Sequence, residues 1–209
     1  MLATRLQRIL LLVLVTLLAA IAAVLVIDRS QPAATSVIAV HSGFDGPTFP
    51  QGLRAAGFTL RDQSGRGVTL GRFRGQVVVL TFIHSLCHDT CPFMVEQIKG
   101  ALNLLPGQGR GVPVLGVSVA PGEDTPATRR AFLRRHGMEA RVAFLNGPLP
   151  AIRRVWHDYA IQPVKGPIDH STFVLLIDRR GYERVGFPAD QLTPEGLSHD
   201  IRVLEGQRA

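Results

Sequence analysis

The pattern of apolar and polar positions divides the chain into three parts. Residues 9–27 read ILLLVLVTLLAAIAAVLVI, a run without charge in which only Thr16 is polar. Residues 28–52 have no regular period and carry Pro, Gly, Ser and Ala, which is typical of a linker. Across residues 53–209, short apolar runs alternate with amphipathic stretches, and this pattern predicts one folded domain.

The first apolar part is long enough to cross a membrane. Its 19 residues span about 28 Å in a helix, close to the ~30 Å hydrocarbon core of a bilayer. Arg5 and Arg8 precede it, so the positive-inside rule puts residues 1–8 in the cytoplasm and the domain on the other side. A cleaved signal peptide is the alternative, because Ala20 and Ala22 are small, but its apolar region usually spans only ~7–15 residues. We therefore expect a retained transmembrane anchor.

Continuous apolar runs predict the strands of a central sheet. QVVVLTFI, residues 76–83, is rich in β-branched residues at successive positions, as expected of a strand buried on both faces. Residues 58–70 read FTLRDQSGRGVTL, two short alternating runs around a Gly-containing turn, which predicts a hairpin. Further strands are expected at GVPVLGVSV (111–119), RVAFLN (141–146), STFVLLID (171–178) and YERVGFP (182–188).

The stretches between these runs predict helices. Thr125 suits an N-cap, Pro126 the first helical position and Gly137 the position just past a helix end, so one helix is expected between them. Pro92 is expected in the first turn of another helix, where its missing N–H costs little. Two more are expected near residues 149–160 and 193–204. Strands that alternate with helices predict an α/β fold, a central mixed sheet flanked by helices.

Charge adds little to this picture. The net charge is +7, and 21 of the 23 basic residues are Arg. Four Arg pairs are scattered along the chain without interleaved aromatic residues: Arg129-Arg130, Arg134-Arg135, Arg153-Arg154 and Arg179-Arg180. Such pairs usually form solvated helix faces, so we expect no nucleic-acid partner, while docking onto an acidic partner or anionic lipid stays open.

The candidate chemistry lies in TFIHSLCHDTCPFMVEQI, residues 81–98, which holds both cysteines of the chain. Cys87 and Cys91 are four residues apart, a spacing that brings two side chains to one face of a helical turn. In an oxidising exterior compartment such a pair forms a disulfide, a redox couple or part of a metal site. Because the pair follows a predicted core strand and precedes a helix, the helix N-terminus is expected to favour the thiolate form.

Two sulfurs do not complete a metal site, so a third ligand must come from elsewhere. Among the seven histidines, His170 ends a Pro- and Gly-containing loop directly before the strand expected beside residues 76–83. In a thioredoxin-like sheet, that loop faces the cysteine turn. His88, adjacent to Cys87, is a further candidate, and Asp169 could orient an imidazole from outside the ligand set.

These motifs resemble the Sco/SenC family of thioredoxin-fold copper proteins of bacterial and mitochondrial inner membranes. The resemblance covers residues 57–206 and is carried by FTLRDQSGRGVTLGRFRGQVVVLTFIHSLCHDTCP, VSVAPGEDTPATRRAFLRRHG and IDHSTFVLLIDRRG. It implies that Cys87, Cys91 and His170 bind one copper ion, as Cu(I) and also as Cu(II). It further implies that the chain sits in a bacterial inner membrane with its C-terminal domain in the periplasm. It also implies a partner, the CuA-bearing subunit of cytochrome c oxidase or another copper protein, which receives copper or has its thiols kept reduced.

Three readings of the thiol pair stay open. A metallochaperone without turnover is favoured, because thioredoxin-like oxidoreductases place a cis-proline before the strand opposite the cysteines, and this sequence has His-Ser-Thr there. The alternative is a membrane-anchored thiol-disulfide oxidoreductase or thiol peroxidase, with Cys87 attacking and Cys91 resolving. The third reading is a structural disulfide between the two. His88 and Ala120 depart from the family pattern, which commonly has Pro and an acidic residue at these positions.

Overall fold

The structure is a computed structural model that describes residues 11, 14–17, 43–161 and 173–207. The chain divides into two compact units, Met1–His41 and Ser42–Ala209. In the first unit, the described residues are helical. Across the described parts of the chain, no helix combines the length and apolar character needed to span a bilayer. Most of the expected anchor lies outside the described residues.

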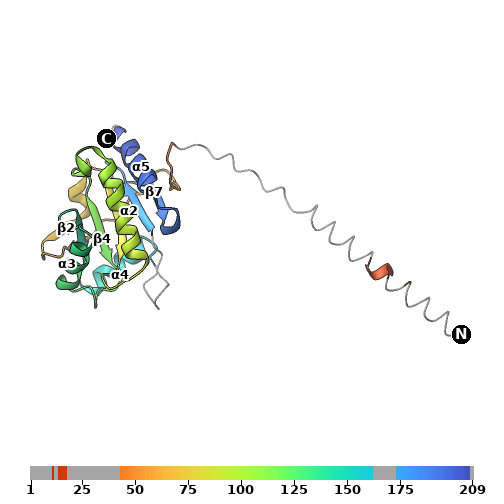
Figure 1. The fold of residues 1–209 in the computed structure, drawn as a ribbon, viewed down its shortest axis with the longest axis horizontal. Coiled ribbons are helices and arrows are strands. Elements are labelled where there is room, and N and C mark those ends of the chain that lie inside the picture. Colours follow the sequence, from red (N-terminus) through yellow and green to blue (C-terminus); the bar gives the residue numbers. More distant parts are fainter. Residues whose placement is uncertain (1–10, 12–13, 18–42, 162–172, 208–209) are drawn as a thin grey trace. The chain divides into compact units, whose positions relative to one another are not determined.

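The second unit is built on a five-stranded mixed sheet with the order β5-β4-β3-β6-β7 (Figure 1). The central strand β3 is buried at all six positions, which confirms the expectation for its continuous apolar run. Its parallel neighbour is β4 and its antiparallel neighbour is β6, as predicted for the strand after His170. The strands are β3 (Val78–Ile83), β4 (Val114–Ser118), β5 (Val142–Leu145), β6 (Phe173–Ile177) and β7 (Glu183–Pro188).

Helices cover both faces of this sheet. One face packs against α2, α3 and α5 in a single apolar cluster, and the other packs against α4 and a small hairpin of β1 and β2. The helices are α2 (Thr90–Leu104), α3 (Pro126–Arg135), α4 (Leu149–Asp158) and α5 (Pro194–Gly206). The hairpin strands are β1 (Thr59–Arg61) and β2 (Gly67–Thr69), and three short 3₁₀ turns complete the unit: η1 (Leu70–Phe73), η2 (Pro106–Gly109) and η3 (Ala189–Gln191). The predicted layers of helix, sheet and helix are confirmed.

Local chemistry sets the helix ends as the sequence predicts. The Thr125 hydroxyl accepts the N–H of Thr128 at 3.1 Å, and Pro126 is the first residue of α3. Gly137 follows this helix with a φ of +65°, a left-handed conformation that glycine adopts without steric cost. A side-chain cap from Thr125 therefore fixes where α3 begins, at the end of the loop that follows β4.

Both outer edges of the sheet are occupied. The segment before β1 runs along β7: the Phe49 N–H donates to the Arg184 carbonyl at 3.0 Å, and the Gly186 N–H donates to the Pro47 carbonyl at 2.9 Å. This segment includes residues expected as linker. At the β5 edge, the Gln63 side-chain amide makes the hydrogen bonds that a neighbouring strand would make. Its Nε2 donates to the Val142 carbonyl, and its Oε1 accepts the Phe144 N–H. Covered edges leave few unpaired backbone groups for pairing with another chain.

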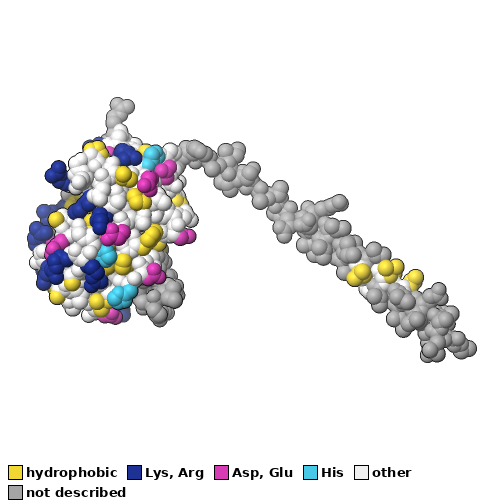
Figure 2. All heavy atoms as spheres, viewed as in Figure 1, with side chains coloured by type: hydrophobic (Ala, Val, Ile, Leu, Met, Phe, Trp, Pro, Cys, Tyr) yellow, Lys and Arg dark blue, Asp and Glu magenta, His cyan; other side chains and the backbone are white. Residues whose placement is uncertain are grey.

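The basic side chains are unevenly placed on the surface. Figure 2 shows Lys and Arg gathered over the side of the domain that carries α3 and β2 in Figure 1. Acidic side chains are more frequent towards α5 and β7 on the same face. On the face shown, the positive charge thus lies mainly over α3 and β2, away from α5 and β7.

Candidate metal and thiol site

The two cysteines lie in and just after the turn that joins β3 to α2. β3 ends at Ile83, and α2 begins at Thr90 with Cys91 as its second residue. The Cys87 N–H donates to the carbonyl of His84 at 3.2 Å, which closes the turn ahead of the helix. The thiols therefore lie at the carboxyl end of the central strand, where open α/β sheets collect their reactive groups.

The two sulfurs have different surroundings. Cys91 is fully buried in the apolar cluster under α2, and its Sγ accepts the backbone N–H of His84 at 3.4 Å. Cys87 is half-buried and packs against the same cluster. Both are present as thiols rather than as a disulfide. One sulfur is thus held rigidly from inside, and the other can be reached from solvent.

The expectation of an easily formed thiolate is wrong for Cys91. A hydrogen bond with the Cys87 thiol, followed by burial, raises the pKa of the Cys91 thiol far above its ordinary value. The N–H of His84 acts in the opposite direction but does not outweigh them. A bound cation would supply the missing stabilisation, because metal binding displaces thiol protons.

A buried carboxylate that sequence reasoning missed anchors the turn. Asp124 is fully buried, accepts the Ser85 N–H at 2.7 Å and accepts the Ser118 hydroxyl at 2.5 Å. The Ser85 hydroxyl in turn donates to the Thr128 hydroxyl at 3.0 Å. Asp124 thereby ties the turn before Cys87 to the end of β4 and the start of α3. A carboxylate directly before an N-capping Thr was the available signal.

The polar residues around the thiols take separate roles. The His84 ring pairs with Glu123 at 3.1 Å, while the His84 backbone N–H donates to the Cys91 sulfur, so His84 supports the site without being a candidate ligand. His88 and Asp89 are both exposed, and the Asp89 side chain makes no cap hydrogen bond to α2. His88 is therefore accessible beside Cys87, without a described contact that fixes it.

His170 and Asp169, the predicted third ligand and its orienting carboxylate, lie outside the described residues. The strand that follows them is described. In β6, Val174 pairs with Thr81 of β3, so the start of β6 lies beside the strand that leads to the thiols. The ligand role of His170 stays a prediction.

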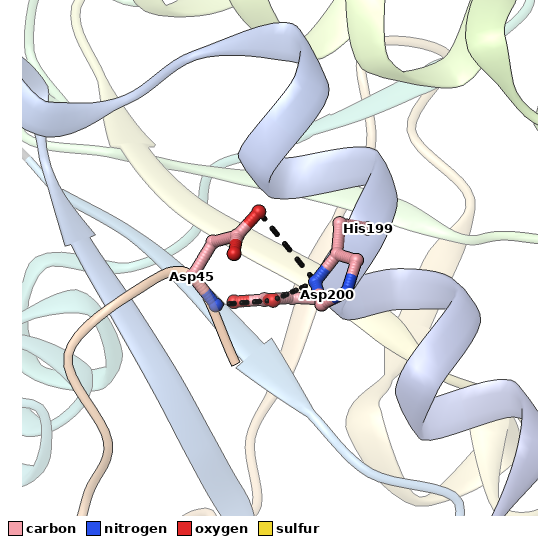
Figure 3. A group of neighbouring side chains, drawn as sticks. All are labelled: Asp45, His199 and Asp200. Atoms are coloured by element: carbon pink, nitrogen blue, oxygen red, sulfur yellow. Dashed lines mark hydrogen bonds and ion pairs between the residues drawn. The ribbon is translucent and has the colours of Figure 1, made fainter. Parts of the chain in front are cut away.

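A second group of possible ligand atoms includes neither cysteine. One ligand atom each from Asp45, His199 and Asp200 lies within 4.8 Å of the other two (Figure 3). Among the described residues, these three side chains form the group of His, Cys, Asp or Glu that could hold a metal ion. The fully buried Asp200 carboxylate accepts the backbone N–H groups of Asp45 and Gly46 at 2.7 and 3.0 Å. Its oxygens are already used to fasten the start of the domain to α5, so a structural role accounts for the group.

Comparison with known proteins identifies relatives of this chain. A family model described as SCO1/SenC matches residues 49–204. The mitochondrial SCO2 homolog of Bos taurus is 28% identical over 156 residues, which are 68% of this chain and 58% of that protein. The chain thus spans less than two thirds of the length of this curated relative.

Solved structures share the fold. Bradyrhizobium japonicum ScoI, solved with copper bound, has a TM-score of 0.62 and 27% identity, covering 73% of this chain and 99% of ScoI. BsSco, described as having a disulfide switch and as a member of the Sco family of cytochrome c oxidase assembly proteins, has a TM-score of 0.65 and 21% identity, covering 78% and 99%. The predicted thioredoxin-like α/β fold is confirmed.

Proposed function

This chain belongs to the SCO1/SenC family, and from that premise we propose that it is a membrane-anchored copper metallochaperone. Its cargo is one copper ion, held by the Cys87 and Cys91 thiolates and the His170 imidazole. It delivers this ion to the CuA site during cytochrome c oxidase assembly, or keeps the thiols of that site reduced. The copper-bound state of the related ScoI and the assembly role of BsSco's family support the proposal.

One observation carries the copper assignment: two sulfurs meet at the start of α2 in unequal surroundings. Thiolate sulfur is the soft donor that Cu(I) prefers, and two thiolates with one imidazole suit three-coordinate Cu(I). The buried Cys91 sulfur is fixed by His84, while the half-buried Cys87 sulfur is open to a partner. An acceptor protein can therefore approach Cys87 and take over the ion through it. His88 and Asp169 are proposed to modulate the site rather than to complete it.

The position of the domain in the cell is part of the proposal. Residues 9–27 form a retained single-pass helix in the bacterial inner membrane, and the domain lies in the periplasm. The uncharged apolar run and the preceding Arg5 and Arg8 support this topology. A related structure from Bacillus anthracis is described as a SCO1/SenC family lipoprotein.

A second function is favoured by the same unequal burial. In thiol-disulfide exchange, the thiolate of Cys87, the more exposed of the two cysteines, would attack a partner disulfide and release one partner thiolate. Cys91 would then attack the Cys87 sulfur of the mixed disulfide, which releases the second partner thiolate and leaves a Cys87–Cys91 disulfide. The partner gains two electrons, and an external dithiol must restore the pair.

Cu(I) competition against a chromophoric chelator tests the first function. The full chain, purified reduced and without oxygen, is expected to bind one Cu(I) per chain. Cys87→Ser, Cys91→Ser and His170→Ala should each weaken binding by at least about tenfold, given that even supporting residues of metal sites contribute ~10–100-fold. His157→Ala is the matched control, since that side chain is 88% exposed on α4.

An insulin-reduction assay run beside the titration separates the two functions. If the cysteine and His170 variants bind copper as well as the parent, the metal assignment fails. If His170→Ala leaves strong thiol-disulfide exchange intact and the parent binds copper only weakly, the oxidoreductase reading replaces it.

A further inference from the structure

A hollow of about 590 Å³ lies between the end of α4, the start of β6, β7 and the segment along the β7 edge. Its volume falls in the range of about 300–1,000 Å³ that is typical of small-molecule sites. The walls are mainly apolar and include the rings of Phe49, Tyr159 and Phe173, together with the carboxyl group of Glu183. A charged group among aromatic rings calls for an explanation.

A bulge in the sheet turns Glu183 towards this hollow. Leu176 of β6 pairs with Val185, but the next residue, Ile177, pairs with Glu183, so one residue of β7 is left over. Residues directly opposite in an antiparallel pair share a face, and Ile177 belongs to the cluster on the α4 side. Without the bulge, alternation would put Glu183 beside Val185 on the opposite face. Bulges of this kind re-aim side chains, often next to functional sites.

The Glu183 carboxyl group has no ion-pair or hydrogen-bond partner among the described residues. Its residue is 8% exposed, and burial raises the pKa of this carboxyl group to about 7. The other charged residues of the lining are already engaged: Arg54 lies over the Tyr182 ring at 4.9 Å, and Asp158 pairs with Arg154 and His157. Glu183 therefore offers a largely buried acceptor on the wall of the hollow, where a molecule that enters it can bind.

The rings select the kind of molecule. The negative faces of aromatic rings attract organic cations, and cages of aromatic rings recognise quaternary ammonium groups. The Glu183 carboxylate adds an opposite charge to such a cation. A divalent metal ion would need several oxygen ligands, and the lining offers the single unpaired carboxylate. The ring of Phe49 is seated against Gly186, where a Cβ atom would come within 2.8 Å of it. The absence of a side chain at Gly186 thus allows one wall of the hollow to form.

We propose that this hollow binds a small organic ammonium ion, with Glu183 as its counter-ion and Phe49, Tyr159 and Phe173 around its apolar substituents. The residues that line the hollow include neither Cys87 nor Cys91, so this proposal does not rest on copper binding. Its ligand is a molecule that combines one positive charge with a compact apolar body.

Choline and 3,3-dimethylbutan-1-ol test this inference, because they have the same shape and differ in the charge of one atom. Calorimetric titration of the purified full chain at pH 8, where Glu183 is ionised, is expected to give one saturable choline site per chain. Choline should bind at least about tenfold more tightly than the uncharged isostere, because only the cation is attracted by the rings and the carboxylate. Glu183→Gln should abolish this preference, while Glu205→Gln, an exposed carboxyl on α5, should retain it. Phe173→Leu removes one aromatic face and should weaken choline binding about fivefold.

The comparison of the two probes on the unaltered chain decides the matter even if a variant fails to fold. Equal binding of both probes, or no saturable choline binding, overturns the proposal. So does a folded Glu183→Gln variant that keeps the preference for choline. One Cu(I) bound with unchanged affinity in Glu183→Gln shows that the thiol site is intact, so failure here leaves the proposed copper function untouched.

Discussion

The pH dependence of stability provides a direct test of the Glu183 environment. Burial raises the pKa of its carboxyl group from 4.5 to about 7 in the folded chain. At low pH the group is protonated in the folded and the unfolded chain and contributes no pH dependence. As the pH rises above 4.5, the unfolded chain releases its proton first. The free energy of unfolding must therefore fall as the pH rises from 4.5. Above about pH 7 the folded chain also releases its proton, and the fall levels off.

The magnitude follows from the two pKa values. Each pKa unit corresponds to about 1.36 kcal/mol, so the folded chain loses about 3 kcal/mol from this group between pH 4.5 and pH 8. Glu183→Gln removes the titration and keeps a side chain of similar size. Relative to the parent, the variant should thus gain about 3 kcal/mol over this pH range.

Urea unfolding at several pH values between 4.5 and 8.5 measures this difference. The signal can come from Trp156, the single Trp of the chain, which is a buried residue of α4. Glu205→Gln serves as the control, since its exposed position predicts no such trend. A difference between Glu183→Gln and the parent that stays constant with pH would show that Glu183 is solvated or paired, and the reasoning on the hollow would lose its electrostatic basis.

Two further predictions concern the support of the thiol turn. Asp124→Ala leaves the buried Ser85 N–H and the Ser118 hydroxyl without their acceptor, so it should lower the free energy of unfolding by about 3 kcal/mol and weaken Cu(I) binding. Asp124→Asn keeps an amide oxygen that can accept the Ser85 N–H, so it should lose less stability in urea unfolding. Equal losses of stability in the two variants would contradict this account. Thr125→Ala removes the cap of α3 and should lower the free energy of unfolding by about 1 kcal/mol in the same assay, while Thr125→Ser should stay close to the parent. A loss of stability below ~0.3 kcal/mol would mean that the Thr128 N–H finds another acceptor.

The sequence by itself determined the features that depend on local physics. The β-branched run at residues 76–83 became the central strand, because such a run is stable only where both faces are covered. Thr125, Pro126 and Gly137 set the limits of α3, since capping involves only neighbouring residues. The placement of Cys87 and Cys91 at a strand-to-helix junction followed from the same reading, whereas the convergence of His170 on them remains a prediction.

The tertiary structure alone decided which polar groups are buried and what they contact. Asp124 lies 37 positions after Cys87 in the chain, yet it holds the turn before that thiol; the unequal burial of the two sulfurs and the high pKa of Cys91 likewise depend on packing under α2. Glu183 occupies a position whose alternation predicts the opposite face, and a one-residue bulge reverses it. These outcomes rest on contacts between distant segments and on strand register, which no local pattern of residues encodes.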